Sequence, residues 1–150
     1  MSKARLRELA DAVAATINAE TWALPFIATR SYRPHYVAAS DALEVCVRPF
    51  RRERIGPVGR LKNEWHYIID IVVMQKCEFR DNDQVDPLLD LSYSLADRFE
   101  PDAAGSQRRV LTSPLARVVK VEDMPAAYAW EYALDDQFTS VKRLTIQVVE

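Results

Sequence analysis

Glycine is scarce in this chain, with three residues in 150, whereas about ten are expected at the usual frequency of ~7%. A glycine-rich phosphate-binding loop is therefore not expected, and neither G-x-G-x-x-G nor G-x-x-x-x-G-K occurs. No apolar run approaches the ~20 residues that a membrane span needs. The start of the chain is amphipathic and lacks a signal-peptide core. We expect a soluble protein made in a cytoplasm, with no membrane partner.

Cysteine and histidine are equally scarce, with two of each. Cys46 and Cys77 lie in predicted strands without any sign of export, which favours reduced, buried thiols over a disulfide. Neither C-x₂-C nor H-x₃-H spacing occurs, so we expect no metal and no cofactor. His66 and Asp70 share a strand face but stand about 13 Å apart, too far for a hydrogen bond. We expect no enzyme and no catalytic residues, since a small hydrolase or transferase would need residues assembled from distant positions.

The composition is that of one folded domain spanning residues 1–150. Hydrophobic residues make up 49% of the chain and charged residues 28%, which is ordinary for a globular protein. A chain of this length suits a single core. The formal net charge of −2 argues against a dedicated nucleic-acid binder, although charge can still be concentrated locally.

Two segments have the apolar spacing of amphipathic helices. The first is predicted to begin with Ser2 as its cap and to end at Asn18. The second is predicted to begin with Asp83 as its cap and to carry Pro87 in its first turn. The residues predicted to face the core are Leu6, Leu9, Ala10, Val13, Ala14 and Ile17 in the first helix, and Val85, Leu88, Leu89, Ser92, Leu95, Ala96 and Phe99 in the second.

Strand patterns fill most of the remaining chain. They cover Trp22–Pro34, Leu43–Arg48 with Pro49 weakening its end, Trp65–Lys76, Arg109–Val121 with an interruption at Pro114, and Phe138–Val149. The strand from Trp65 has one apolar face and one mixed face, which is typical of a central strand covered well on one side only. The apolar face comprises Trp65, Tyr67, Ile69, Ile71 and Val73. In the last strand we expect Leu144, Ile146 and Val148 to point inward, and Lys142, Arg143, Thr145 and Gln147 mostly outward.

The order of these elements predicts the fold class. It is α-β-β-β-α-β-β, with no internal repeat. We expect an α+β domain in which a mostly antiparallel, four- to five-stranded sheet carries two amphipathic helices on one face and a long hairpin arm.

Two segments carry opposite charge. We call residues 48–63 the basic arm; they show no period and contain Gly56, Pro57 and Gly59, as a hairpin arm or a long loop does. We call residues 122–137 the acidic connection, which can include a short helix. The net charge is +5 for the basic arm and −5 for the acidic connection. The candidate contact residues are Arg48, Arg51, Arg52, Arg54, Arg60 and Lys62 in the arm, and Glu122, Asp123, Tyr128, Trp130, Glu131, Asp135 and Asp136 in the connection.

These charges have three interpretations. Both segments can be solvated loops whose charge serves solubility. They can instead face each other across a repeated subunit contact, since a head-to-tail interface joins two different patches and can close into a ring. The arm can also face DNA phosphates, although Phe50 alone supplies a stacking ring, so single-strand binding is poorly supported. The aromatic residues Tyr128, Trp130 and Tyr132 are either core residues or anchors of a protein contact.

Six segments spread over most of the chain share their residue patterns with a known protein family. They are Leu6–Ala14, Thr29–Pro34, Leu43–Pro49, Tyr67–Lys76, Val85–Leu91 and Arg143–Val148. In these segments the chain resembles the tail-terminator proteins of long-tailed bacteriophages and prophages, also called tail-completion or neck proteins. The resemblance lies in the residue patterns of helices and strands, not in a catalytic signature.

The resemblance implies a structural virion protein of the head–tail neck, present in the host cytoplasm before assembly. It implies a homo-oligomeric ring, commonly hexameric, that stops growth of the tail tube and joins the finished tail to the head connector. The expected partners are further copies of the chain, the tail tube protein and the head connector or stopper proteins, with non-specific contact to DNA in the lumen left open. Two alternatives remain: another neck protein (stopper or adaptor), or a DNA-contacting accessory module.

Overall fold

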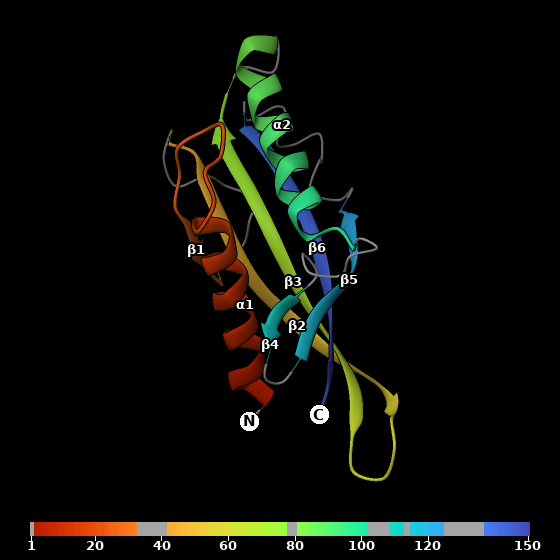
Figure 1. The fold of residues 1–150 in the computed structure, drawn as a ribbon. Coiled ribbons are helices and arrows are strands. Elements are labelled where there is room, and N and C mark those ends of the chain that lie inside the picture. Colours follow the sequence, from red (N-terminus) through yellow and green to blue (C-terminus); the bar gives the residue numbers. More distant parts are fainter. Residues whose placement is uncertain (1, 33–41, 78–80, 102–108, 113–114, 125–136) are drawn as a thin grey trace.

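The computed structural model of the chain describes residues 2–32, 42–77, 81–101, 109–112, 115–124 and 137–150. These residues form a single sheet with strands in the order β1-β2-β3-β6-β5-β4, and two helices lie against it (Figure 1). The elements in chain order are α1 (Ser2–Asn18), β1 (Ala28–Arg30), β2 (Glu44–Pro57), β3 (Asn63–Lys76), α2 (Asn82–Phe99), β4 (Arg109–Thr112), β5 (Leu115–Asp123) and β6 (Gln137–Val149). The predicted mixture of a sheet with two helices is confirmed.

The sheet is larger and more mixed than predicted. It has six strands, and β1 runs parallel to β2 while the other neighbours are antiparallel. The prediction of four to five strands is wrong because the run from Arg109 to Val121 folds as two paired strands, β4 and β5. Proline cannot donate to a strand ladder, and Pro114 falls between them in the sequence. Within the described residues, the strand expected from Trp22 to Pro34 is reduced to the three residues of β1.

α1 forms and buries the face that its spacing predicts. The predicted inward residues Leu9, Ala10, Val13, Ala14 and Ile17 are all buried, and Leu6 packs at the margin of the core. The Asn18 side chain attaches the end of the helix to β1: its Nδ2 donates to the Ala28 carbonyl at 2.9 Å and its Oδ1 accepts from the Ala28 N–H at 2.8 Å. The side chain of Ser2 lies outside the described part, so its capping role stays a prediction.

α2 begins earlier than predicted, and most of its predicted inward face is confirmed, since Leu88, Ser92, Leu95, Ala96 and Phe99 are buried. Its N-cap is Asp81 and not Asp83: the Asp81 carboxylate accepts a hydrogen bond from the Asp83 N–H at 3.0 Å. Pro87 therefore lies in the second turn instead of the first. Leu91 is buried, whereas Leu89, which we expected in the core, is 39% exposed. Both leucines fit the helical period, and only the placement of the helix on the sheet decides between them.

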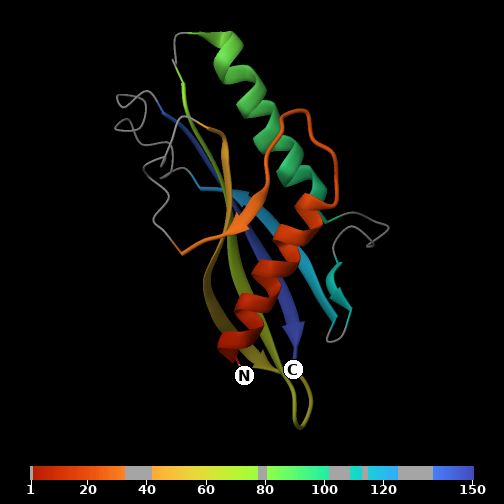
Figure 2. The same ribbon diagram turned by 90° about the vertical axis from the view of Figure 1, so that its left-hand side faces the viewer.

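The main core lies between the two helices and one face of the sheet (Figures 1 and 2). Side chains alternate across a strand, so every second residue of β3 and β6 reaches this core. The predicted inward residues are buried there: Tyr67, Ile69, Ile71, Val73, Leu144, Ile146 and Val148. None of the helices in the described ranges is long and apolar enough to cross a membrane.

The opposite face of the sheet is also covered over part of its length, so the prediction of one-sided cover for β3 is wrong. All residues from Tyr67 to Met74 are buried. Val72, Met74 and Val141 form a second, smaller cluster on this face, and Asp70 is 0% exposed. The mixed character of this face is as predicted, but a mixed pattern does not say whether the face is covered.

Lys142 of β6 points toward the helices, contrary to prediction. It is 2% exposed; its ammonium lies 4.3 Å from the centre of the Tyr93 ring and forms an ion pair with Asp123. A buried cation needs such partners, and here they come from α2 and β5. The period of the strand places Lys142 on the face of Leu144. The outward prediction followed the charge of Lys142 instead of this period and is wrong. Thr145, also expected outside, is 9% exposed.

Candidate interaction surface

The basic arm is the outer part of the β2–β3 hairpin and projects beyond the rest of the molecule (Figure 1). Pro49 does not end β2 as its chemistry suggested; it keeps its place in the ladder, and a bulge follows it before Arg51. A second bulge lies nearer the tip, and bulges increase the local twist of a hairpin. The turn closes with a hydrogen bond from the Val58 N–H to the Lys62 carbonyl at 2.8 Å. Gly59 occupies this turn at φ 89°, a conformation that favours glycine. Of the two earlier alternatives, the hairpin is confirmed.

The arginines near the base of the arm are held by neighbours on the hairpin. Arg51 forms an ion pair with Glu53 at 2.6 Å. The guanidinium of Arg52 lies 4.1 Å from the centre of the Trp65 ring, close enough for a cation–π contact. These contacts fix two of the predicted cations on opposite faces of the arm, since adjacent strand residues point to opposite sides.

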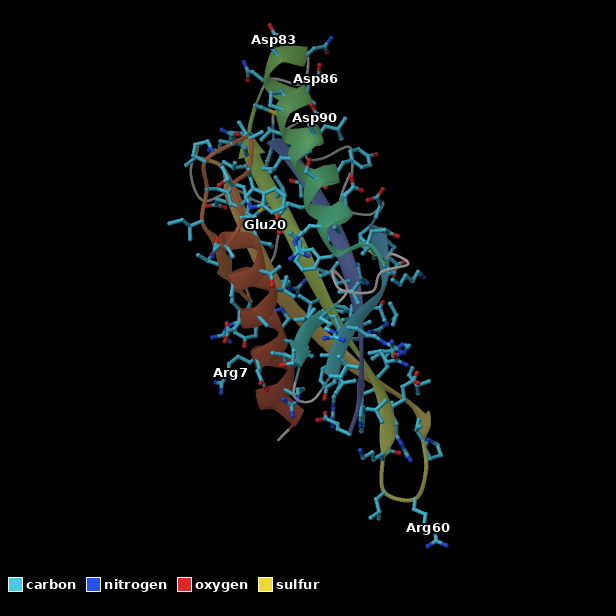
Figure 3. The ribbon with its side chains drawn as sticks, viewed as in Figure 1. Arg7, Glu20, Arg60, Asp83, Asp86 and Asp90 are labelled. Atoms are coloured by element: carbon cyan, nitrogen blue, oxygen red, sulfur yellow. The ribbon has the colours of Figure 1, made fainter. Side chains whose placement is uncertain are left out.

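The tip of the arm is both cationic and apolar. Arg54 donates from Nε and Nη2 to Asn63 Oδ1 at 3.2 and 2.9 Å. Arg60 and Lys62 are exposed in the turn, and Figure 3 shows Arg60 pointing away from the molecule. Leu61 between them is 94% exposed. Ile55 and Val58 are also exposed, at 50% and 48%. An apolar group surrounded by cations at the end of a projecting hairpin is suited to a protein contact.

Among the described residues, the outer edge of β2 has no neighbouring strand along Arg51–Pro57. β1 pairs with β2 only from Val45 to Val47, and Arg51–Pro57 pairs with β3. Such an edge is a template for pairing with another chain, and proteins protect it with charged side chains, prolines and bulges. The arm carries charged side chains, prolines and bulges. It is therefore suited to bind a partner through its side chains and not by strand pairing.

Three guanidinium groups surround Phe50 at the base of the arm. Those of Arg48 and Arg51 each lie 5.5 Å from the ring centre, and that of Arg143 lies 4.5 Å from it. Arg143 is fixed by Asp70, to which it donates from Nε and Nη2 at 2.8 and 3.0 Å. The hydrogen bonds to Asp70 raise the pKa of Arg143. Both oxygens of the Asp70 carboxylate therefore help to hold Arg143 in place.

A cavity of about 460 Å³ opens beside this base. It is lined by Arg51, Glu53, His66, Ile68, Val119, Lys120, Glu122, Arg143 and Thr145. His66 Nε2 lies 3.1 Å from Glu64 Oε2, while Asp70 bonds to Arg143, so His66 and Asp70 have separate partners. Within the ranges that the structure describes, no group of three or more His, Cys, Asp or Glu side chains could hold a metal ion.

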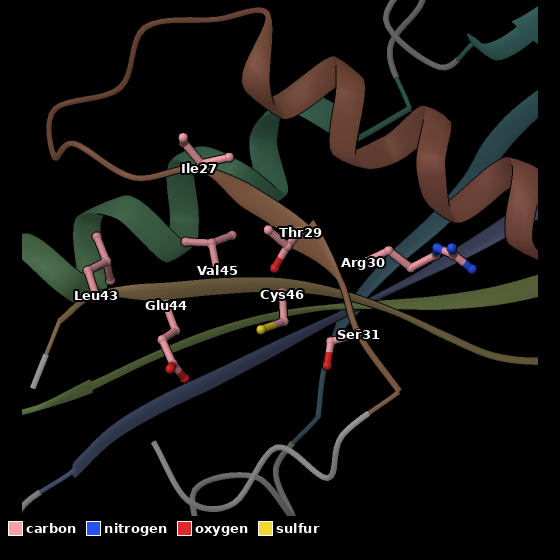
Figure 4. Close-up of a pocket in the computed structure, with 8 residues that line it drawn as sticks. All are labelled: Ile27, Thr29, Arg30, Ser31, Leu43, Glu44, Val45 and Cys46. Atoms are coloured by element: carbon pink, nitrogen blue, oxygen red, sulfur yellow. The ribbon is translucent and has the colours of Figure 1, made fainter. Parts of the chain in front are cut away.

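A second cavity of about 330 Å³ lies beside β1 (Figure 4). Its lining residues are Ile27, Thr29, Arg30, Ser31, Leu43, Glu44, Val45 and Cys46. In Figure 4, Glu44 and Cys46 point to one side of β2 and Val45 to the other, as the strand period requires. Cys46 and Cys77 are not joined in a disulfide; Cys77 is buried as predicted, whereas Cys46, also predicted to be buried, is half-buried. Among the described residues that line this cavity, Cys46 supplies a thiol and none is a histidine.

The acidic connection is described only at its beginning. Glu122 lies 3.4 Å from Lys120, and Asp123 pairs with Lys142, so neighbours in the same chain already offset both charges. The other candidate residues lie outside the described residues: Tyr128, Trp130, Glu131, Asp135 and Asp136. The proposed contact between the basic arm and the acidic connection therefore stays a prediction.

α2 carries an exposed acidic side that sequence reasoning did not single out. Asp83, Asp86, Asp90 and Asp97 are all exposed, and we call them the acidic helix face. Figure 3 shows the first three at the end of the molecule opposite Arg60. The signal was present, because spacings of three, four and seven residues place side chains on one side of a helix. This spacing does not by itself indicate a contact surface, because charged residues also form the solvent-facing side of any amphipathic helix.

Comparison with known proteins adds no family to this description. No protein-family model matches the chain. A search of curated proteins found none that matches it. The function is therefore inferred from the residues, their geometry and the resemblance of the six sequence segments.

Proposed function

We propose that the chain is a non-enzymatic structural protein of the virion that forms a ring at the head–tail junction, ends the tail tube and joins the tail to the head connector. The observation that carries the proposal is the projecting arm, with its cationic and apolar tip held away from the body. An apolar side chain as exposed as Leu61, at 94%, gains free energy when a partner covers it. The resemblance to tail terminators indicates what those partners are: further copies of the chain, the tail tube protein and the head connector.

A ring is supported by the asymmetry of the molecule. The arm leaves one end of the sheet, and the amino-terminal half of α2 lies at the other end (Figure 3). A contact between two such different surfaces is head-to-tail, and head-to-tail contacts close into a ring when the rotation between subunits allows it. Within the virion such a ring can present one rim to the tail tube and the other to the head connector.

The proposal is tested by deleting the gene from the phage or prophage genome that encodes it and imaging the lysate by electron microscopy. We expect tail tubes of unregulated length and heads without tails, and complementation in trans should restore virions. Tails of uniform length that fail to join heads would assign the stopper or adaptor role in the same neck instead. Normal virions without the gene would overturn both roles.

The arrangement of cations at the base of the arm favours a second candidate, a DNA-contacting module. Arg48, Arg51 and Arg143 converge on Phe50, and the basic arm has a net charge of +5. Clustered guanidinium groups bind phosphates without sequence preference. Titration of labelled duplex DNA followed by fluorescence polarisation tests this candidate. Micromolar binding that weakens steeply with salt and is lost in Arg51→Glu/Arg52→Glu/Arg54→Glu would favour it, and absence of binding at low salt would exclude it.

A further inference from the structure

Two segments that reach opposite ends of the molecule carry opposite and equal charge. Residues 81–100, which include α2, have a net charge of −5, and the basic arm has +5. Figure 3 shows Asp83, Asp86 and Asp90 at one end of the molecule and Arg60 at the other. At physiological salt the Debye length is about 8 Å, so the two ends do not attract each other within one copy. They are free to attract the opposite ends of other copies.

The acidic helix face has the character of a docking surface. Its four aspartates are exposed, and the structure shows no ion pair for any of them within the described residues. Two exposed apolar side chains lie beside them on α2: Leu89 at 39% and Tyr93 at 52%. A surface that joins unpaired charges of one sign to apolar groups needs a partner with cations and apolar groups of its own.

The basic arm fits this surface in composition and length. Its tip offers Arg60 and Lys62 together with the apolar residues Val58 and Leu61. From Asp83 to Asp97 the helix rises about 21 Å at 1.5 Å per residue. From Arg51 to Val58 the hairpin extends about 23 Å at 3.3 Å per residue. The arm and the acidic helix face are therefore about equally long.

We propose that the basic arm of one copy docks along the acidic helix face of α2 in the next copy, and that this contact joins the subunits of the ring. The inference rests on the proposed function and names the partner surface of the arm as α2, in place of the acidic connection. The partner is a second copy of this chain, because the chain itself supplies both complementary surfaces and places them where a single copy cannot bring them together.

Two charge-reversed variants of the full chain test the contact. The arm variant is Arg54→Glu/Arg60→Glu/Lys62→Glu, and the helix variant is Asp86→Lys/Asp90→Lys/Asp97→Lys. Asp83 is left unchanged because its carboxylate lies in the first turn of α2, where a negative charge stabilises the helix. We expect each variant alone to need at least ~100-fold more protein for half-assembly in sedimentation velocity, since like charges in contact cost several kcal/mol.

Mixing the two variants gives the decisive result. In an equimolar mixture each acidic arm meets a basic helix, and each unchanged arm meets an unchanged helix. We therefore expect the mixture to assemble within ~10-fold of the wild-type concentration, as a ring in which the variants alternate. A third variant, Arg7→Glu/Arg109→Glu/Lys120→Glu, makes the same change in net charge outside the arm and should assemble like the wild type. Circular dichroism and thermal unfolding must show that all variants fold.

Several results would overturn the inference. They are a wild-type chain that stays monomeric at every concentration, a helix variant that assembles normally, and a mixture that stays dissociated. Rescue of the arm variant by Asp135→Lys/Asp136→Lys would also overturn it, because the acidic connection would then be the acceptor. If rings still form when α2 is substituted, the proposed function is unaffected and only the docking contact is wrong. Normal virions after the gene deletion would exclude the proposed function independently.

Discussion

The inner and outer halves of the β2–β3 hairpin share one antiparallel ladder but differ in nearly everything around it. In the inner half, β3 is buried on both faces from Tyr67 to Met74. In the outer half, the side chains of the arm are largely exposed, and β2 lacks a second neighbour among the described residues. The inner half therefore stabilises the fold, and the outer half is available for contact. Substitutions should therefore separate the two: inner ones change stability, and outer ones change assembly.

The largest effect on stability is expected from Ile71→Ala in the inner half. Ile71 is 0% exposed and belongs to the main core. Removing its side chain leaves a cavity, and such a change costs about 4 kcal/mol of unfolding free energy. Urea denaturation measures this loss. A cost below ~1 kcal/mol would mean that this part of the sheet is not packed as described.

The next largest effect is expected from Asp70→Ala. This change leaves Arg143 without the carboxylate that holds it, at a side-chain exposure of 18%. Breaking such a pair costs on the order of 3 kcal/mol. The double variant Asp70→Ala/Arg143→Met should recover much of the loss, since no uncompensated charge remains. Equal losses in the single and double variants would contradict this explanation, because the loss would then not come from the unpaired charge of Arg143.

A smaller, pH-dependent effect is expected from Tyr67→Phe. Burial, the 2.6 Å hydrogen bond to Glu150 and the negative charge of Glu150 raise the pKa of Tyr67 from 10.0 to about 12, although Arg52 opposes the shift. The folded state therefore prefers the protonated phenol. The resulting stability is complete below pH 10 and is lost as the pH rises toward 12.

The phenylalanine variant lacks this titration. At neutral pH it should lose about 1 kcal/mol with the hydrogen bond. Between pH 10 and 12 the wild type should lose stability faster than the variant, so the two curves converge. Chemical denaturation at a series of pH values checks both points. Parallel curves would contradict the raised pKa of Tyr67.

The smallest effect on stability is expected from Leu61→Ser at the tip of the arm. Leu61 is 94% exposed, so the unfolding free energy should change by less than ~0.5 kcal/mol. Assembly should nevertheless weaken, because a contact loses a buried apolar group. Ile27→Ser is the matched control: Ile27 is 77% exposed and lies ahead of β1. Equal assembly of the two variants would separate the arm from the subunit contact.

The sequence predicted the faces of single elements better than the environment of the whole sheet. The spacing of Leu9, Val13 and Ile17 was sufficient to find the buried side of α1, and the alternation from Tyr67 to Val73 found the main core face of β3. The cover on the opposite face of β3 could not be predicted, because it depends on segments distant in the sequence. For Lys142, the partners Tyr93 and Asp123 likewise come from other elements.

The candidate surface was predictable only where it depends on neighbouring residues in the sequence. The charge and hairpin character of the basic arm follow from local residues such as Arg54, Pro57 and Gly59. The bulge that keeps Pro49 inside the strand was not predictable, because it depends on pairing with β3. The arm and the acidic helix face lie at opposite ends of the molecule because β3 leads from one to the other (Figure 3). The strand predicted from Trp65 to Lys76 already implied this separation.

The central claim is that the basic arm serves assembly and not folding. Sedimentation of the wild type and of the Arg54→Glu/Arg60→Glu/Lys62→Glu variant at equal concentration, with both shown to be folded, tests it most directly. We predict a closed oligomer for the wild type and a folded monomer for the variant. A variant that assembles as the wild type does, or a wild type that is monomeric at every concentration, would contradict the claim.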